Sequence, residues 1–131
     1  MRDLDRSALA SVRVPARRLL SSWSDHDWRG GIRVDEMATL ERLIIKTANS
    51  TYDIILVDPE RAGVLIRGGA FVPVYTPARL AGSSLGGSFL KLRSVHVGFR
   101  LELGTDRGFI ITSPVRDVTI APPVADPNDI M

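Results

Sequence analysis

Apolar and polar residues alternate with a period of two along much of the chain after residue 35. In the clearest stretch, residues 95–103, every second residue is apolar, and His, Gly, Arg and Glu stand between them. Such alternation predicts a β-strand with one buried and one solvent-facing side. Shorter runs predict further strands at Tyr52 to Leu56, Val64 and Ile66, Phe71 and Tyr75, Leu90 and Leu92, Phe109 to Thr112, and Val118 to Ile120.

Turn-forming residues separate these runs. Ala48-Asn49-Ser50 predicts a tight hairpin, because Asn tolerates the left-handed region of backbone conformation. Residues 58–63 predict a longer turn, and residues 104–108 predict a third hairpin connection. Asp35 is placed to cap a short helical turn, whereas the β-branched pair Ile44-Ile45 favours a strand by residue 43.

About seven strands at a spacing of roughly 8–12 residues predict an all-β fold, a small barrel of mostly antiparallel strands over residues 35–121. Residues 1–34 are rich in arginine and predict a flexible arm, in which Leu4, Ala8, Leu9 and Val12 have the spacing of a short helix that Pro15 interrupts. Residues 122–131 contain three prolines and predict a disordered tail.

Composition narrows the classes of function. The net charge is +2, and all but Lys46 and Lys91 of the 17 basic residues are arginine. So small a charge argues against nucleic acid as the main partner, because such binding neutralises several phosphates at once. Cysteine is absent, which excludes disulfides and thiolate chemistry. No apolar run approaches the roughly 20 residues of a membrane span and no secretory signal is evident, so we expect a cytoplasmic protein.

The glycine-serine segment is the main candidate for chemistry. Gly82-Ser83-Ser84-Leu85-Gly86 fits the G-x-S-x-G pattern, which requires a strand-to-helix elbow and an acid before the histidine. No helix is predicted after it, and His96 precedes Asp106 and Asp117, so a bend or bulge between strands is the better interpretation.

The other motifs are incomplete as well. No Gly-Lys-Ser/Thr completes a phosphate loop around Gly87. The triplet Asp25-His26-Asp27 lacks the distant ligands that would complete a metal site. We therefore predict no catalytic residue, no metal, no cofactor and no enzymatic activity.

Two resemblances follow from particular segments. The chain resembles a group of uncharacterised small bacterial β-domain proteins, a likeness that implies a fold type and no activity. Its residues are Gly69-Ala70-Phe71, Thr76-Pro77-Ala78, the run from Gly82 to Lys91, and Thr112-Ser113-Pro114-Val115.

The second resemblance is to the PilZ domain, a small β-barrel that binds cyclic di-GMP. That family carries R-x-x-x-R before the barrel and D/N-x-S-x-x-G on a strand. Here Arg13 and Arg17 have the first spacing, and Ser84 and Gly87 keep the second register, with Gly82 where the acid or amide belongs. The resemblance implies a phosphate ligand held by arginines, whose forked guanidinium groups match phosphate oxygens.

Three functional hypotheses result. The first is a non-enzymatic β-barrel binding module that forms homodimers or binds a partner protein, with Trp23 and Trp28 of the arm as interaction residues. The second is binding of cyclic di-GMP or another phosphate ligand by Arg13, Arg17 and Arg18 against Ser84 and Gly87. The third is weak nucleic-acid binding through the basic arm.

Overall fold

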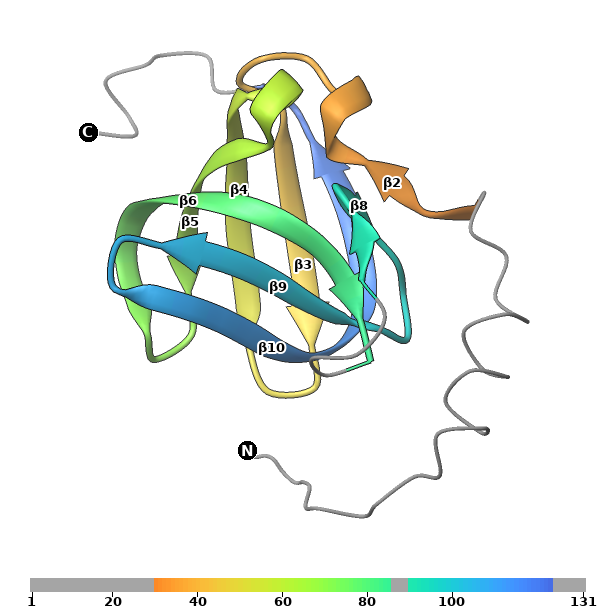
Figure 1. Cartoon of the computed structure of the whole chain (residues 1–131), viewed down its shortest axis with the longest axis vertical. Helices are drawn as coiled ribbons and strands as arrows, with labels where there is room; N and C mark the ends of the chain where they lie inside the picture. The colour runs from red at the N-terminus through yellow and green to blue at the C-terminus, as the bar shows by residue number, and fades with distance from the viewer. Residues whose placement is uncertain (1–29, 86–89, 124–131) are drawn as a thin grey trace.

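The computed structural model describes residues 30–85 and 90–123 (Figure 1). Strands dominate these residues, and every strand pairing among them is antiparallel, which confirms the all-β prediction. The elements are β2 (Ile32–Arg33), the 3₁₀ helix η2 (Val34–Glu36), β3 (Arg42–Thr47), β4 (Thr51–Asp58), the 3₁₀ helix η3 (Pro59–Arg61), β5 (Gly63–Gly68), β6 (Val72–Ser84), β7 (Lys91–Leu92), β8 (Ser94–Val95), β9 (Arg100–Thr105) and β10 (Gly108–Ala121).

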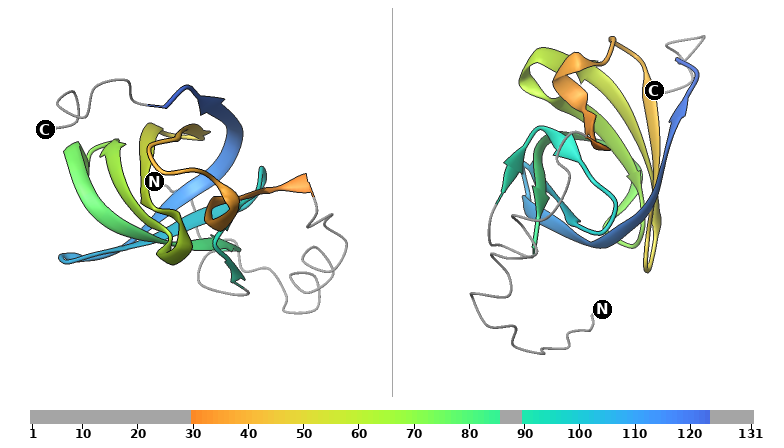
Figure 2. Two further views of the ribbon diagram at one scale, coloured as in Figure 1. Left: turned by 90° about the horizontal axis from the view of Figure 1, so that it is seen from above. Right: turned by 90° about the vertical axis from the view of Figure 1, so that its right-hand side faces the viewer.

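The main sheet closes on itself. Its strand order is β5-β4-β3-β10-β9-β6-β7, and β5 also pairs with β6, so six strands form a ring that β7 extends. A second sheet contains only β2 and β8. The strands of the ring curve around a common axis, as the two views in Figure 2 show. Closure of this kind leaves few backbone edges without a neighbouring strand.

The β3–β4 hairpin has the turn that the sequence predicts at residues 48–50. Asn49 does not use the left-handed region, because the described non-glycine residues with positive φ are Leu40, Ala62 and Arg93. The Thr47 hydroxyl organises the turn instead. Its Oγ1 accepts the Ser50 N–H at 3.1 Å and donates to the Ser50 carbonyl at 3.1 Å.

The period of two gives the correct inner lining for the central strands. Tyr52, Ile54 and Leu56 of β4 are buried, and Ile54 pairs with Leu43 of β3 and Ile66 of β5. Their burial supplies the main stabilisation of the ring, at about 1.5–3 kcal/mol for each large aliphatic side chain. The core also contains Val34, Ile45, Ala62, Val64, Val72, Leu80, Val95, Leu101, Leu103 and Val115.

Residues 95–103 do not form the single strand that their alternation predicts. A turn at Val97-Gly98 divides them into β8 and β9, Gly98 has a φ of 95°, and Val97 is 55% exposed. The inward direction predicted for Leu90 and Leu92 is also wrong, because both side chains are exposed. Val97 lies in a turn, and Leu90 and Leu92 lie at the two-residue strand β7, whose residues are both exposed, so the alternation does not give the side-chain direction in either place.

The last strand, β10, pairs with two different neighbours. Residues 108–114 pair with β9, and residues 115–121 pair with β3. The register shifts between Ile111 and Pro114 and again between Val115 and Asp117, so the strand is bulged where it changes partner. Bulges bend a strand and increase its twist, which lets one long strand take part in both halves of a small ring.

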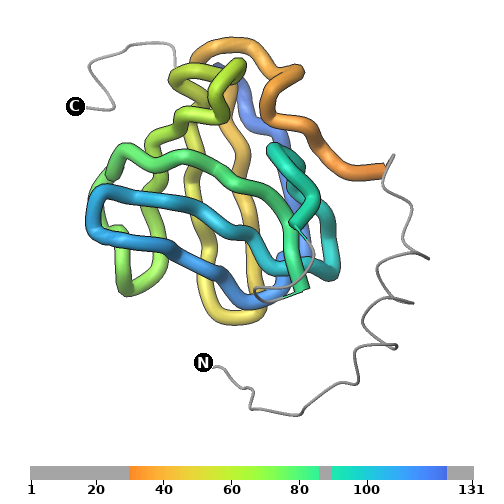
Figure 3. Tube along the Cα trace, viewed as in Figure 1, coloured from red at the N-terminus to blue at the C-terminus, as the bar shows by residue number. Residues whose placement is uncertain are grey.

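The two ends of the ring differ. One end is covered by η2 and η3, which contact each other, with Val34 of η2 fully buried (Figure 1). The turns of the β3–β4 and β5–β6 hairpins lie at the other end, near the first half of β10 (Figure 3). Residues 30–34 of the predicted arm are thus part of the described fold, and residues 1–29 and 124–131 lie outside it.

Candidate functional site

Most residues of the predicted ligand site lie outside the described part of the chain. These are Arg13, Arg17, Arg18 and Gly87, and the interaction residues Trp23 and Trp28 lie outside it as well. Ser84 is described, at the end of β6, and its side chain is fully buried. The cyclic di-GMP and nucleic-acid hypotheses that depend on the arm therefore stay predictions.

The serines at the end of β6 attach β8 to the ring. Ser83 Oγ donates to the Ser94 carbonyl at 2.9 Å and accepts the backbone N–H of His96 at 3.1 Å. Ser83, Ser84 and His96 are all buried. Both polar functions of the Ser83 hydroxyl are used in holding the backbone, which gives this serine a structural role. No solvent-accessible nucleophile results from the G-x-S-x-G pattern.

Gly82 is required by the backbone at this point. Its φ is 149°, and a Cβ atom added there would overlap the carbonyl of Lys91 on β7. The β6–β9 register shifts between Leu80 and Gly82, just before the predicted bend, and Gly82 to Ser84 themselves remain paired within β6. An aspartate or asparagine, as the PilZ pattern has at this position, would not fit this backbone without a shift of β7.

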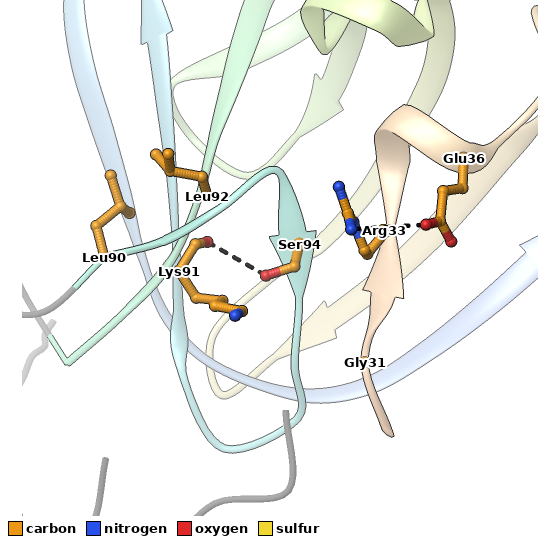
Figure 4. Close-up of a pocket in the computed structure, with 7 residues that line it drawn as sticks. All are labelled: Gly31, Arg33, Glu36, Leu90, Lys91, Leu92 and Ser94. Carbon is orange, nitrogen blue, oxygen red and sulfur yellow. Dashed lines mark hydrogen bonds and ion pairs between the residues drawn. The ribbon is translucent and has the colours of Figure 1, made fainter. Parts of the chain in front are cut away.

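One groove lies where the described chain begins, and we call it the entry groove (Figure 4). Its volume is 690 Å³, and its lining residues are Gly31, Arg33, Glu36, Leu90, Lys91, Leu92 and Ser94. The Arg33 guanidinium is already paired, at 2.6 Å with Asp35 and 3.6 Å with Glu36. This pairing lowers the pKa of Asp35 and leaves no unpaired arginine in the groove for an anionic ligand.

A second groove lies at the other end of the ring, beside the first half of β10, and we call it the edge groove. Its volume is 500 Å³, and its lining residues are Asn49, Ser50, Tyr52, Ala70, Phe71, Ile110, Ile111, Thr112 and Ser113. Burial raises the pKa of Tyr52, opposed by a hydrogen bond with Ser50. The tyrosine is therefore neutral, and none of the described residues that line the edge groove carries a charge.

Four consecutive residues of β10 line the edge groove because the strand has a free edge there. Residues 108–114 pair with β9 on one side, and no strand of the described chain pairs with residues 108–113 on the other. The β3–β4 turn closes the far end, where the Ala48 N–H donates to the Pro114 carbonyl at 3.2 Å. The free edge thus ends at Ser113.

Large apolar side chains surround this edge. Phe71 is 78% exposed, Phe109 is 85% exposed, and Ile111 is 47% exposed. Phe109 lies over Gly104 of the paired strand, which has no side chain of its own to cover the backbone. The sequence predicts a strand over residues 109–112 but misses this surface, because alternation does not reveal which side of a strand lacks a covering layer.

A polar network crosses the outside of the ring from β3 to β6. Asp53 Oδ2 accepts from the Arg42 guanidinium at 2.9 Å and from the Tyr75 hydroxyl at 2.8 Å. The Arg67 guanidinium lies 3.6 Å from the same oxygen and 4.2 Å from the centre of the Tyr75 ring. The Asp53 carboxylate thus contacts side chains of three other strands, β3, β5 and β6. We interpret the network as a connection between strands.

The described residues add no other candidate chemistry. No group of three histidine, aspartate or glutamate side chains within residues 30–85 and 90–123 is arranged to hold a metal ion. None of the described helices is long and apolar enough to cross a membrane. The chain matches no protein-family profile, no curated protein and no solved structure.

Proposed function

We propose that the chain is a non-enzymatic binding module that associates with its own copies through the edge groove. One observation carries the proposal: Phe71 and Ile111 line one groove and are both exposed, beside a strand edge that no other described strand pairs with. Aromatic residues are enriched in protein interfaces, and an exposed apolar surface of this kind marks an interaction site. A symmetric dimer is the commonest assembly of soluble proteins.

The electrostatics of the groove support a protein partner over an anionic ligand. The described lining of the edge groove carries no charge, so burying it against another apolar surface leaves none of these residues as an unpaired ion. Phosphate ligands and nucleic acids are held by several arginine or lysine side chains, and this groove presents none.

Sedimentation velocity of the full chain tests the proposal. We expect a dimer at about 100 µM protein, a concentration well above a Kd of about 1 µM, which corresponds to about 8 kcal/mol of binding free energy. Ile111→Ser should shift the protein to the monomer, because it places a hydroxyl in the apolar contact.

Ile120→Ser is the matched control for this variant. Ile120 lies on the same strand and is 54% exposed, but it does not line the edge groove, and its partner in the sheet is Leu43 of β3. We expect it to leave the dimer intact. A monomeric full chain at every concentration would overturn the proposal, and equal loss of the dimer in both variants would show that the edge groove is not the contact.

A further inference from the structure

We infer that two copies join through the free edges of their β10 strands, which pair antiparallel around Ile110, so that the sheet of one copy continues into the other. This inference rests on the proposed self-association and names the contact that produces it. It requires three properties of the edge: unused backbone groups, a sequence that pairs with itself, and a boundary that favours a second copy over a longer partner strand.

The turn between β9 and β10 determines which backbone groups of β10 face the edge that no other described strand pairs with. Only Asp106 and Arg107 separate the paired residues Thr105 and Gly108. The closing pair of a two-residue hairpin exchanges its hydrogen bonds across the hairpin, and the next residues alternate. The N–H and C=O groups of Phe109 and Ile111 therefore point away from β9, toward the free edge.

The backbone N–H and C=O groups of Phe109 and Ile111 can pair with the same groups of a second copy. In an antiparallel pair centred on Ile110, Phe109 lies opposite the partner's Ile111, and the same pair recurs on the other side of the two-fold axis. Each pair exchanges two backbone hydrogen bonds, about four in the whole contact. Residues 108–113 carry no charge, so no like charges oppose each other in this register.

The side chains around the edge match the same register. Phe109 and Ile111 lie on the outer face of β10, whereas Ile110 packs against the core. Phe71 and Ile111 line one groove, so the partner's Phe109, opposite Ile111, would extend this apolar cluster. Aromatic and β-branched pairs of this kind each stabilise a sheet by roughly 0.2–1 kcal/mol.

The short length of the edge favours a second copy over a foreign strand. The regular pairing of β10 with β9 ends after Ile111, where Thr112 Oγ1 accepts the Leu101 N–H at 3.0 Å in the bulge. The β3–β4 turn, whose Ala48 N–H donates to the Pro114 carbonyl, then blocks an added strand from pairing further along β10. A long foreign strand would gain only a few hydrogen bonds here, whereas a second copy buries two such apolar surfaces at once.

Disulfide cross-linking tests the register, because the chain contains no cysteine. In Ile110→Cys the two thiols would face each other across the two-fold axis, within the distance that a disulfide spans. We expect a covalent dimer on mild oxidation, formed about tenfold faster than in Ile120→Cys, which is cross-linked only by random collision. Equal rates in the two variants would overturn the edge pairing.

A pair of variants at position 109 tests the backbone contribution in case the cysteine at residue 110 disturbs the core. Phe109→Ala keeps the N–H, and Phe109→Pro removes it on the side away from β9, where proline is tolerated in an edge strand. With the β-sheet circular dichroism unchanged, we expect the proline variant to bind its copy at least tenfold more weakly than the alanine variant.

Equal affinities of the two variants would overturn the backbone pairing. If Ile110→Cys forms a non-covalent dimer but no disulfide on oxidation, the edge pairing is refuted and self-association is not. A monomeric wild-type chain would refute both.

Discussion

Strand β4 and the first half of β10 share a kind of side chain but have different surroundings. Both are rich in apolar β-branched residues, and both follow a tight turn. β4 has a neighbour on each side, β3 and β5, and its Ile54 is 0% exposed. Among the described strands, the first half of β10 pairs only with β9, and its Ile111 is 47% exposed.

The comparison shows that an isoleucine can stabilise the fold or offer apolar surface to a partner, depending on which strand carries it. An isoleucine in β4 contributes to folding, because its side chain leaves water when the ring closes. An exposed isoleucine on β10 contributes little to the folded monomer, and its apolar surface is available for a partner. Four experiments, in order of decreasing expected effect, test this contrast.

The largest effect is expected from Ile54→Ala. The truncation leaves a cavity among Leu43, Ile66 and the facing core residues, so the free energy of unfolding should fall by about 3 kcal/mol. Ile111→Ala should lower it by about 1 kcal/mol or less, because half of that side chain is already in water. Urea denaturation at protein concentrations low enough to keep the monomer measures both, and similar losses would contradict the contrast between the strands.

Two glycines with positive φ provide the second comparison. At Gly82 an added Cβ overlaps the Lys91 carbonyl, whereas at Gly108, with a φ of 123°, it meets nothing within 4 Å. Both alanine variants are strained by the backbone angle, so each should lose more than about 1 kcal/mol of unfolding free energy. Gly82→Ala should lose clearly more in thermal unfolding, because β7 must also move. Equal losses would show that the β6–β7 contact yields without cost.

Asp53→Asn should weaken the outer network of the closed strands. The change removes the charge that holds Arg42 and Tyr75, and the carboxylate is only 14% exposed. Hydrogen bonds to charged groups contribute about 1.5–3 kcal/mol, so we expect a loss near the lower end of this range in urea denaturation. Asp106→Asn, in the exposed β9–β10 turn, should stay within about 0.5 kcal/mol. An equal loss in both would mean that the network contributes nothing.

The smallest effect concerns the two tyrosines, both on strands of the closed region. Burial raises the pKa of Tyr52, and burial with the hydrogen bond to Asp53 raises the pKa of Tyr75. A raised pKa favours the neutral phenol in the folded state. Its contribution to stability is therefore complete below pH of about 10 and is lost as the pH rises through the folded-state values.

Ultraviolet titration of the tyrosinate band measures this effect. We expect both groups to ionise above pH of about 10 in the folded protein, and Asp53→Asn to bring the Tyr75 titration closer to the ordinary value. A single titration at the ordinary pKa would mean that neither phenol is shielded in solution.

Local chemistry explains which parts of the fold could be predicted. The lining of β4 follows from the alternation at Tyr52, Ile54 and Leu56, and the β9–β10 turn follows from its polar residues between two glycines. The alternation fails at Val97, because this residue lies in the turn between β8 and β9 and is exposed, whereas Val95 and Phe99 on either side of the turn are buried. The candidate site could not be predicted, since Phe71 and Ile111 are 40 residues apart and meet only when the ring closes.

The strand content and the turns of this protein can be predicted from the amino-acid sequence, because side-chain alternation and turn residues act within a few neighbouring positions. Which apolar residues stay exposed depends on how the strands pack in three dimensions. That outcome depends on whether a second strand or an opposing layer reaches each residue, and β10 changes its partner at the bulge after Ile111. Exposure of Phe109 and Ile111 is thus a property of the closed ring, in which residues 108–113 have a single neighbouring strand among those described.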